Sequence, residues 1–192
     1  MKKFIFDLQR FAPPDMPGGG GGSSSSSSVS YSAANSITGA GTYSSETYKS
    51  TTADQNSVLV SLSSGTVNLI DPTVTKSGDS DGGDNCNFYG INSAVMALGG
   101  GTLSISGGTV TASAKGANGV FSYGGNGGTN GAAGDGTTII IAGNTHKTTG
   151  DNGRGLITTR RGQTKTPNLN TNTKGHPPPP HRTHKRGREV TL

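Results

Sequence analysis

Residues 102–111 read TLSISGGTVT, two short runs of alternating apolar and polar side chains joined by a pair of glycines. Successive side chains of a β-strand point to opposite faces, so Leu103 and Ile105 share one face and the serines share the other. Gly107 and Gly108 form a strong turn signal. This segment therefore predicts a strand, a tight turn and a second strand with one apolar face.

The same pattern returns at a fixed interval of 36 residues. The three copies share a threonine start, an alternating strand, a short turn and a second Thr-rich strand, and they span residues 66–75, 102–111 and 138–147. A further apolar segment precedes each copy, at residues 57–60, 94–97 and 119–122, and a fourth such segment lies at 155–158. Asn56, Asn92 and Asn118 stand just ahead of the first three of these segments. An interval of this length is typical of a solenoid.

Stacking explains how so polar a chain can fold. The 192 residues are 28% hydrophobic and 5% aromatic, and 33 of them are glycine, which is too few apolar residues for a helical bundle or a compact enzyme. A single unit cannot bury Leu103 and Ile105, whereas stacked units align such side chains in one apolar column. Thr, Ser and Asn on the outer faces then form ladders. The sequence therefore predicts an all-β solenoid of about four rungs.

Four segments follow from the changes in composition: 1–12, 13–50, 51–175 and 176–192. Residues 1–12 contain FIFDLQRF, either a short strand or helix or a docking or export tag, and the apolar run is too short for a conventional cleaved signal peptide. Residues 13–50 are predicted to be a Gly/Ser-rich flexible linker, with a weak capping strand between 29 and 52 as an alternative. Residues 51–175 hold the repeats. Residues 176–192, with four consecutive prolines, are predicted to be a disordered basic tail.

Charge and cysteine content narrow the set of partners. The net charge of +5 divides into −2 for residues 1–150 and +7 for residues 151–192. The basic tail has no aromatic residue for base stacking and no accompanying nucleic-acid fold, so nucleic acid is not a predicted partner. No apolar run approaches the roughly 20 residues that span a membrane. Cys86 is the only cysteine, so no disulfide forms within the chain.

The motifs NFYGIN (87–92) and GANGVFSYG (116–124) carry a resemblance. Over about residues 42–175 the chain resembles β-helical, adhesin-like repeat proteins of anaerobic gut Firmicutes, and it is similar to carbohydrate-binding β-helix proteins of clostridia. The segment FDLQRF resembles a leader of secreted or phage-associated repeat proteins of the same bacteria. The resemblance implies a right-handed parallel β-helix (a pectin-lyase-like solenoid), an extracellular or cell-surface location and no catalytic activity.

The C-terminal part departs from that pattern. Lys165 and Pro167 are expected at the positions of Leu103 and Ile105, and His146 is expected at the inward position of Val110. We therefore expect an incomplete solenoid with disordered ends, from a truncated or frame-disturbed copy of a longer protein.

Two groups of residues are candidates for binding. Asp79, Asp81 and Asp84 supply the oxygen ligands that Ca²⁺ prefers, although an acidic solvated loop is the favoured interpretation. The aromatic residues near the motifs are candidates for contact with sugars or proteins, or else they close the loops over the rungs: Phe88, Tyr89, Phe121 and Tyr123. The loops 77–90 and 124–136 are expected on one side of the solenoid.

Three functions remain open on these residues. The first is a non-catalytic, adhesin-like surface or secreted module that contacts host or bacterial glycans or proteins. The second is a calcium-dependent carbohydrate-binding module, calcium being the one cofactor considered. The third is a non-functional gene fragment or a lyase-type fragment. The sequence leaves the oligomeric state open.

Overall fold

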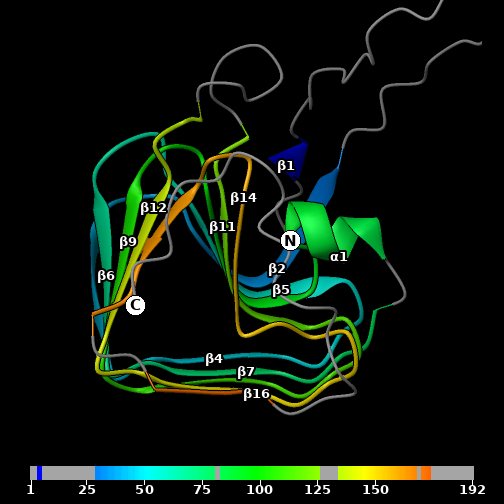
Figure 1. Cartoon of the computed structure of the whole chain (residues 1–192). Coiled ribbons are helices and arrows are strands. Elements are labelled where there is room, and N and C mark those ends of the chain that lie inside the picture. The colour runs from blue at the N-terminus through cyan, green and yellow to red at the C-terminus, as the bar shows by residue number, and fades with distance from the viewer. Residues whose placement is uncertain (1–3, 6–28, 81–82, 126–133, 168–169, 174–192) are drawn as a thin grey trace, which may run out of the picture.

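The chain winds as a coil of roughly triangular cross-section (Figure 1). This computed structural model describes residues 4–5, 29–80, 83–125, 134–167 and 170–173. Three parallel sheets run along the coil, and in the described part each of five turns adds one strand to each sheet. We call such a turn a rung. The predicted all-β, parallel β-helix is thereby confirmed.

Sheet 1 contains six strands: β1 (Phe4–Ile5), β2 (Ser30–Ile37), β5 (Gln55–Ser61), β8 (Ser93–Leu98), β11 (Asn118–Tyr123) and β14 (Leu156–Thr159). Sheet 2 contains five strands: β3 (Gly41–Ser44), β6 (Thr66–Ile70), β9 (Thr102–Ser106), β12 (Thr138–Ala142) and β15 (Gln163–Lys165). Sheet 3 contains five strands: β4 (Thr47–Ser50), β7 (Thr73–Lys76), β10 (Thr109–Ala112), β13 (Thr145–Thr148) and β16 (Asn170–Thr173). Every pairing is parallel except that of β1 with β2.

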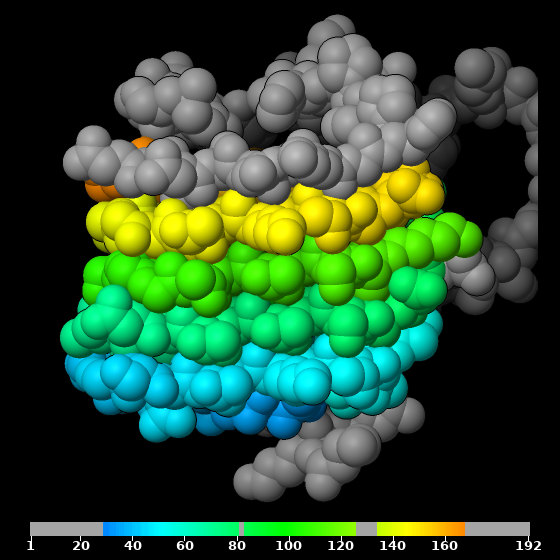
Figure 2. Space-filling view, turned by 90° about the horizontal axis from the view of Figure 1, so that it is seen from below, coloured from blue at the N-terminus to red at the C-terminus, as the bar shows by residue number. Residues whose placement is uncertain are grey.

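The strand register reproduces the interval of 36 residues. In sheet 2, Thr102 pairs with Thr66 on one side and with Thr138 on the other. In sheet 3, Thr109 pairs in the same way with Thr73 and Thr145. Neighbouring strands lie about 4.8 Å apart. Equivalent side chains of successive rungs therefore stand directly over one another, as Figure 2 shows for the layered rungs.

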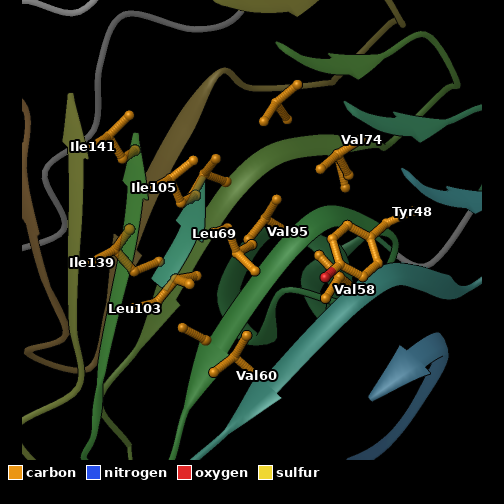
Figure 3. Packing of buried hydrophobic residues seen from close by; sticks show 14 of the residues in the cluster. Tyr48, Val58, Val60, Leu69, Val74, Val95, Leu103, Ile105, Ile139 and Ile141 are labelled. Atoms are coloured by element: carbon orange, nitrogen blue, oxygen red, sulfur yellow. The ribbon is translucent and has the colours of Figure 1, made fainter. Parts of the chain in front are cut away.

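Apolar columns fill the inside of the coil (Figure 3). Leu103 packs between Val67 and Ile139, and Ile105 packs between Leu69 and Ile141; all six side chains are buried. Together with Val58, Val95 and Val120 of sheet 1 they belong to one continuous core cluster. The predicted stacking of inward residues is what builds this core.

The first rung corrects the predicted boundary at residue 51. Residues 30–50 form β2, β3 and β4 instead of a flexible linker. Tyr43 pairs with Leu69 and Tyr48 pairs with Val74, so aromatic rings cover columns that are aliphatic in the next rung. Two tyrosines and Ile37 supply most of the inward apolar surface of this segment. Because its other residues are mostly Ser and Thr, the sequence shows no clear apolar alternation, and the strands are easily missed. The predicted linker before residue 29 and the predicted tail after 176 lie outside the described residues.

The last rung corrects a second prediction. Thr164 pairs with Ile139 and occupies the column of Leu103, whereas Lys165 pairs with Ile140 and is exposed. Arg160 and Arg161, both at positive φ, make the turn before β15. A shift of one residue exchanges the two faces of a strand, and this register leaves the Lys165 ammonium in water.

The two longest loops lie at different corners, contrary to the prediction that they share one side. The loop after Lys76 joins sheet 3 to sheet 1 and contains helix α1 (Asp84–Tyr89). The loop after Tyr123 joins sheet 1 to sheet 2. Helix α1 therefore belongs only to the loop that joins sheet 3 to sheet 1.

Sheet 1 is the sheet that is buried on both faces. Strands β8 and β11 are buried at every residue, while β6 and β9 alternate between buried and more exposed residues. A second apolar cluster covers the outer face of sheet 1; it contains Val29, Tyr31, Leu59, Met96, Leu98, Phe121 and Tyr123, with Tyr89 of α1 packed against it. Sheets 2 and 3 therefore supply the long polar faces of the molecule.

Candidate functional site

The corner beside α1 gathers most of the polar side chains that lie inside the described structure. Helix α1 ends at Gly90, which adopts a left-handed conformation and donates its N–H to the Asn85 carbonyl oxygen. A Cβ atom at position 90 would stand 2.5 Å from the Met96 sulfur and 2.7 Å from the Phe121 ring. Glycine is therefore needed for both the backbone conformation and the close packing of α1 on sheet 1.

Gly90→Ala is expected to loosen this corner. Positive φ costs an alanine about 1–2 kcal/mol, and the clash with Met96 and Phe121 adds to that cost. Cys86 is only 3% exposed, so its rate of labelling by a thiol reagent should rise in the variant. Gly143→Ala is the matched control, because Gly143 also has a positive φ but has no neighbour within 4 Å of the added Cβ. Equal labelling of Cys86 in both variants would contradict the expected role of Gly90.

A hydrogen-bonded chain runs from the helix to the neighbouring turn. The Cys86 thiol donates to the Ser80 hydroxyl oxygen at 3.1 Å, and the Ser80 hydroxyl donates to a carboxylate oxygen of Asp54. An open cavity of about 370 Å³ adjoins this chain. Its lining is mixed polar and apolar and consists of Ser80, Gly83, Cys86, Asn87, Lys115, Gly116 and Asn152. The cavity is large enough for a small polar ligand.

Lys76 lies beneath the same corner and is fully buried. Its Nζ donates to the carbonyl oxygen of Thr52 at 2.9 Å and to that of Gly78 at 2.7 Å. Burial lowers the Lys76 pKa to about 8, although the nearby charges of Asp54, Asp79 and Cys86 act in the opposite direction. The sequence offers a signal for this lysine, because it stands two residues after the inward Val74 in an alternating strand.

The three asparagines that precede the repeats are buried at this corner. The Asn56 Oδ1 accepts from the Ser93 backbone N–H at 2.7 Å, the Asn92 Nδ2 donates to the Gly78 carbonyl at 2.9 Å, and the Asn118 Nδ2 donates to the Cys86 carbonyl at 2.9 Å. Asn56 and Asn118 therefore bond the backbone of a neighbouring rung, whereas Asn92 bonds within its own loop, and all three amides hold the corner in place.

Two of the three predicted calcium ligands, Asp79 and Asp84, lie in the described part. The Asp79 carboxylate accepts the Lys115 backbone N–H at 2.9 Å, Asp84 is exposed at the start of α1, and Asp81 lies outside the described residues. Among the residues that the structure describes, no three His, Cys, Asp or Glu side chains are grouped as a metal site would require. Calcium at this loop stays a prediction.

The aromatic candidates divide into two kinds. Phe121 and Tyr123 are buried, because β11 belongs to the sheet that is covered on both faces, so they do not reach an external ligand. Burial raises the pKa of Tyr123 to about 12. Tyr89 is partly buried, its ring centroid lies 6.1 Å from that of Tyr123, and its carbonyl accepts the Tyr31 hydroxyl at 2.8 Å. Phe88 is also partly buried. Tyr89, Phe121 and Tyr123 thus pack α1 onto sheet 1, in agreement with the alternative that aromatic residues close the loop over the rungs.

Comparison of the chain with models of known families, with curated proteins and with solved structures found no match. The resemblance to adhesin-like repeat proteins therefore stays a prediction that depends on the quoted motifs.

Proposed function

We propose that the chain is a non-catalytic, adhesin-like interaction module, secreted or on the cell surface, that contacts glycans or proteins through its uncovered faces. The observation that carries the proposal is a row of exposed threonines on sheet 3: Thr47, Thr73, Thr109 and Thr145. They stand at equivalent positions of four successive rungs, on the face that Figure 2 views. We call them the threonine row.

The spacing of the row suits a repeating polar ligand. Successive hydroxyl groups follow one another at the rung interval of about 4.8 Å, and each can donate one hydrogen bond and accept two. A second position of the same sheet adds Thr75 and Thr111 in the second and third rungs, with Lys49 in the first rung and Lys147 in the fourth. Such a face presents many weak contacts to an extended polysaccharide or to a polar protein surface.

The rest of the molecule supports a structural role. Its core is a continuous apolar column that holds the outer faces rigid, and rigid presentation lowers the entropy cost of binding. In the part of the chain that the structure describes, no helix has the length and apolar character to cross a membrane.

Binding to a glycan array that includes neutral and acidic polysaccharides and mucin tests the proposal with the full chain. Thr→Val at all four positions of the threonine row is expected to weaken binding at least tenfold, because it removes four hydroxyl groups and keeps the β-branched shape. The matched control is Thr→Val at Thr66, Thr102 and Thr138, the aligned row on sheet 2.

Three results would count against the proposal. The absence of binding to every polysaccharide and to mucin would overturn it. An equal loss in the two sets of variants would reject the threonine row as the contact. Binding that requires calcium and disappears in a chelator would favour the calcium-dependent carbohydrate-binding module instead.

A further inference from the structure

Lys76 is the one buried lysine among the described residues, and it is unusual in its column. Its equivalents in the neighbouring rungs are Ser50 and Ala112, both small. The Lys76 side chain reaches past them to the corner, where it meets the carbonyl oxygens of Thr52 and Gly78. A buried ammonium loses its hydration, and an amine in such a site is readily held in the neutral, nucleophilic form.

Asn92 and Lys76 share one hydrogen-bond acceptor, the carbonyl oxygen of Gly78. The Asn92 Nδ2 and the Lys76 Nζ both donate to the Gly78 carbonyl oxygen, at 2.9 and 2.7 Å. The two nitrogens therefore cannot be further apart than these two distances together. Asn92 is fully buried, and in the described part of the chain its Oδ1 has no hydrogen-bond partner. A primary amine and a carboxamide are thus enclosed side by side, away from water that would compete with the amine.

We propose that Lys76 and Asn92 join in an intramolecular isopeptide bond. The lone pair of the neutral Nζ attacks the Asn92 Cγ, a C–N bond forms, and the Cγ–Nδ2 bond breaks. One proton passes from Nζ to the departing nitrogen, which leaves as ammonia. The step therefore exchanges one amide for another, needs no oxidant or reductant, and starts from the lysine that has already given up its ammonium proton.

The surroundings favour this step through burial, which outweighs the opposing charge of the nearby Asp54 carboxylate. Burial lowers the pKa of Lys76 to about 8, so mildly alkaline conditions release the neutral amine. The product also replaces a buried charge with a neutral amide, which removes the desolvation penalty of the ammonium.

The bond would close the loop that carries α1. Lys76 ends β7 of the second rung, and Asn92 lies just before β8 of the third. A link between them restricts the unfolded chain and fastens the largest described insertion of the coil to its core. Such a fastening fits a molecule whose outer faces have to stay rigid, and the bond itself requires no ligand.

Mass spectrometry of the full chain tests the bond. After incubation at pH 9 and denaturation, the chain is expected to be lighter by the mass of one ammonia, and a proteolytic digest should contain a branched peptide that joins Lys76 to Asn92. Lys76→Arg keeps a cation at the corner but cannot form the bond, so its mass should remain unchanged. Lys115→Arg, at an exposed lysine of the same corner, is the control that should still lose ammonia.

Two outcomes would overturn the proposal. One is an unchanged mass and a digest without the branched peptide. The other is an equal loss of ammonia in Lys76→Arg, because a cyclic imide formed at an asparagine alone gives the same mass change. The digest of the unaltered chain decides the matter even where a variant fails to fold.

Discussion

Replacing His146 with valine is expected to raise the free energy of unfolding at neutral pH by about 2 kcal/mol. His146 pairs with Val110 in sheet 3, in the column that also contains Val74, and it is 1% exposed. Neither ring nitrogen has a hydrogen-bond partner among the residues that the structure describes. Burying two polar atoms without partners is unfavourable, and valine restores the side chain that the preceding rungs carry at Val74 and Val110. Urea denaturation of the two proteins measures the difference.

The same residue gives the stability a dependence on pH. Burial lowers the pKa of His146 from 6.5 to about 4. Between these values the unfolded chain binds a proton that the folded chain does not, so the free energy of unfolding falls as the pH drops from 6.5 to 4. Because one pKa unit corresponds to about 1.4 kcal/mol, the loss over this window reaches about 3 kcal/mol.

His146→Val should therefore flatten the stability profile between pH 6.5 and pH 4. Lys147→Thr is the matched control, because Lys147 is the exposed neighbour of His146 and pairs with Thr111, so the change affects only the outer face. It should leave the slope in place. A slope that is the same in His146→Val and in the unaltered chain would show that other groups cause the acid sensitivity.

The sequence predicts the middle of the coil best, where the repeat is regular. The interval between Thr66, Thr102 and Thr138 gives the register of sheet 2 directly, and it also places His146 at its inward position. The prediction works because each inward side chain has an apolar equivalent one rung away. Periodicity alone is enough wherever both neighbours keep the pattern.

The ends and corners of the coil depend on contacts that the repeat pattern of the sequence does not reveal. Tyr43 and Tyr48 fill the first rung with rings where other rungs use aliphatic side chains, so no repeat marks that rung. Lys165 falls outward because the turn at Arg160 and Arg161 shifts the strand by one residue.

The candidate site was predictable only in part. The loop that contains Asp79, Cys86 and Tyr89 could be located from its composition, but the short helix inside it could not. Its six residues make too little contact among themselves to form a helix without sheet 1 beneath them. Lys76 and Asn92 donate to the same Gly78 carbonyl only once this corner has folded, and no local sequence pattern indicates that they come together.

Leu103→Ala is expected to lower the free energy of unfolding by about 2–5 kcal/mol, because it leaves a cavity in a fully packed column. Leu103 belongs to the middle rung and is enclosed between Val67 and Ile139. Each rung of a solenoid contacts only its neighbours, so a defect here weakens both interfaces of the rung. For a domain whose total stability is about 5–15 kcal/mol, such a loss is a large share.

Ser104→Ala provides the matched control for Leu103→Ala. Ser104 is the next residue of β9, and it faces outward between Asn68 and Ile140. Its replacement removes a partly exposed hydroxyl and should change the stability by no more than about 0.5 kcal/mol. Thermal and urea denaturation of both variants compare the two faces of a single strand. Equal losses at positions 103 and 104 would contradict the assignment of inward and outward columns, since a coil without a packed interior has no reason to distinguish adjacent residues.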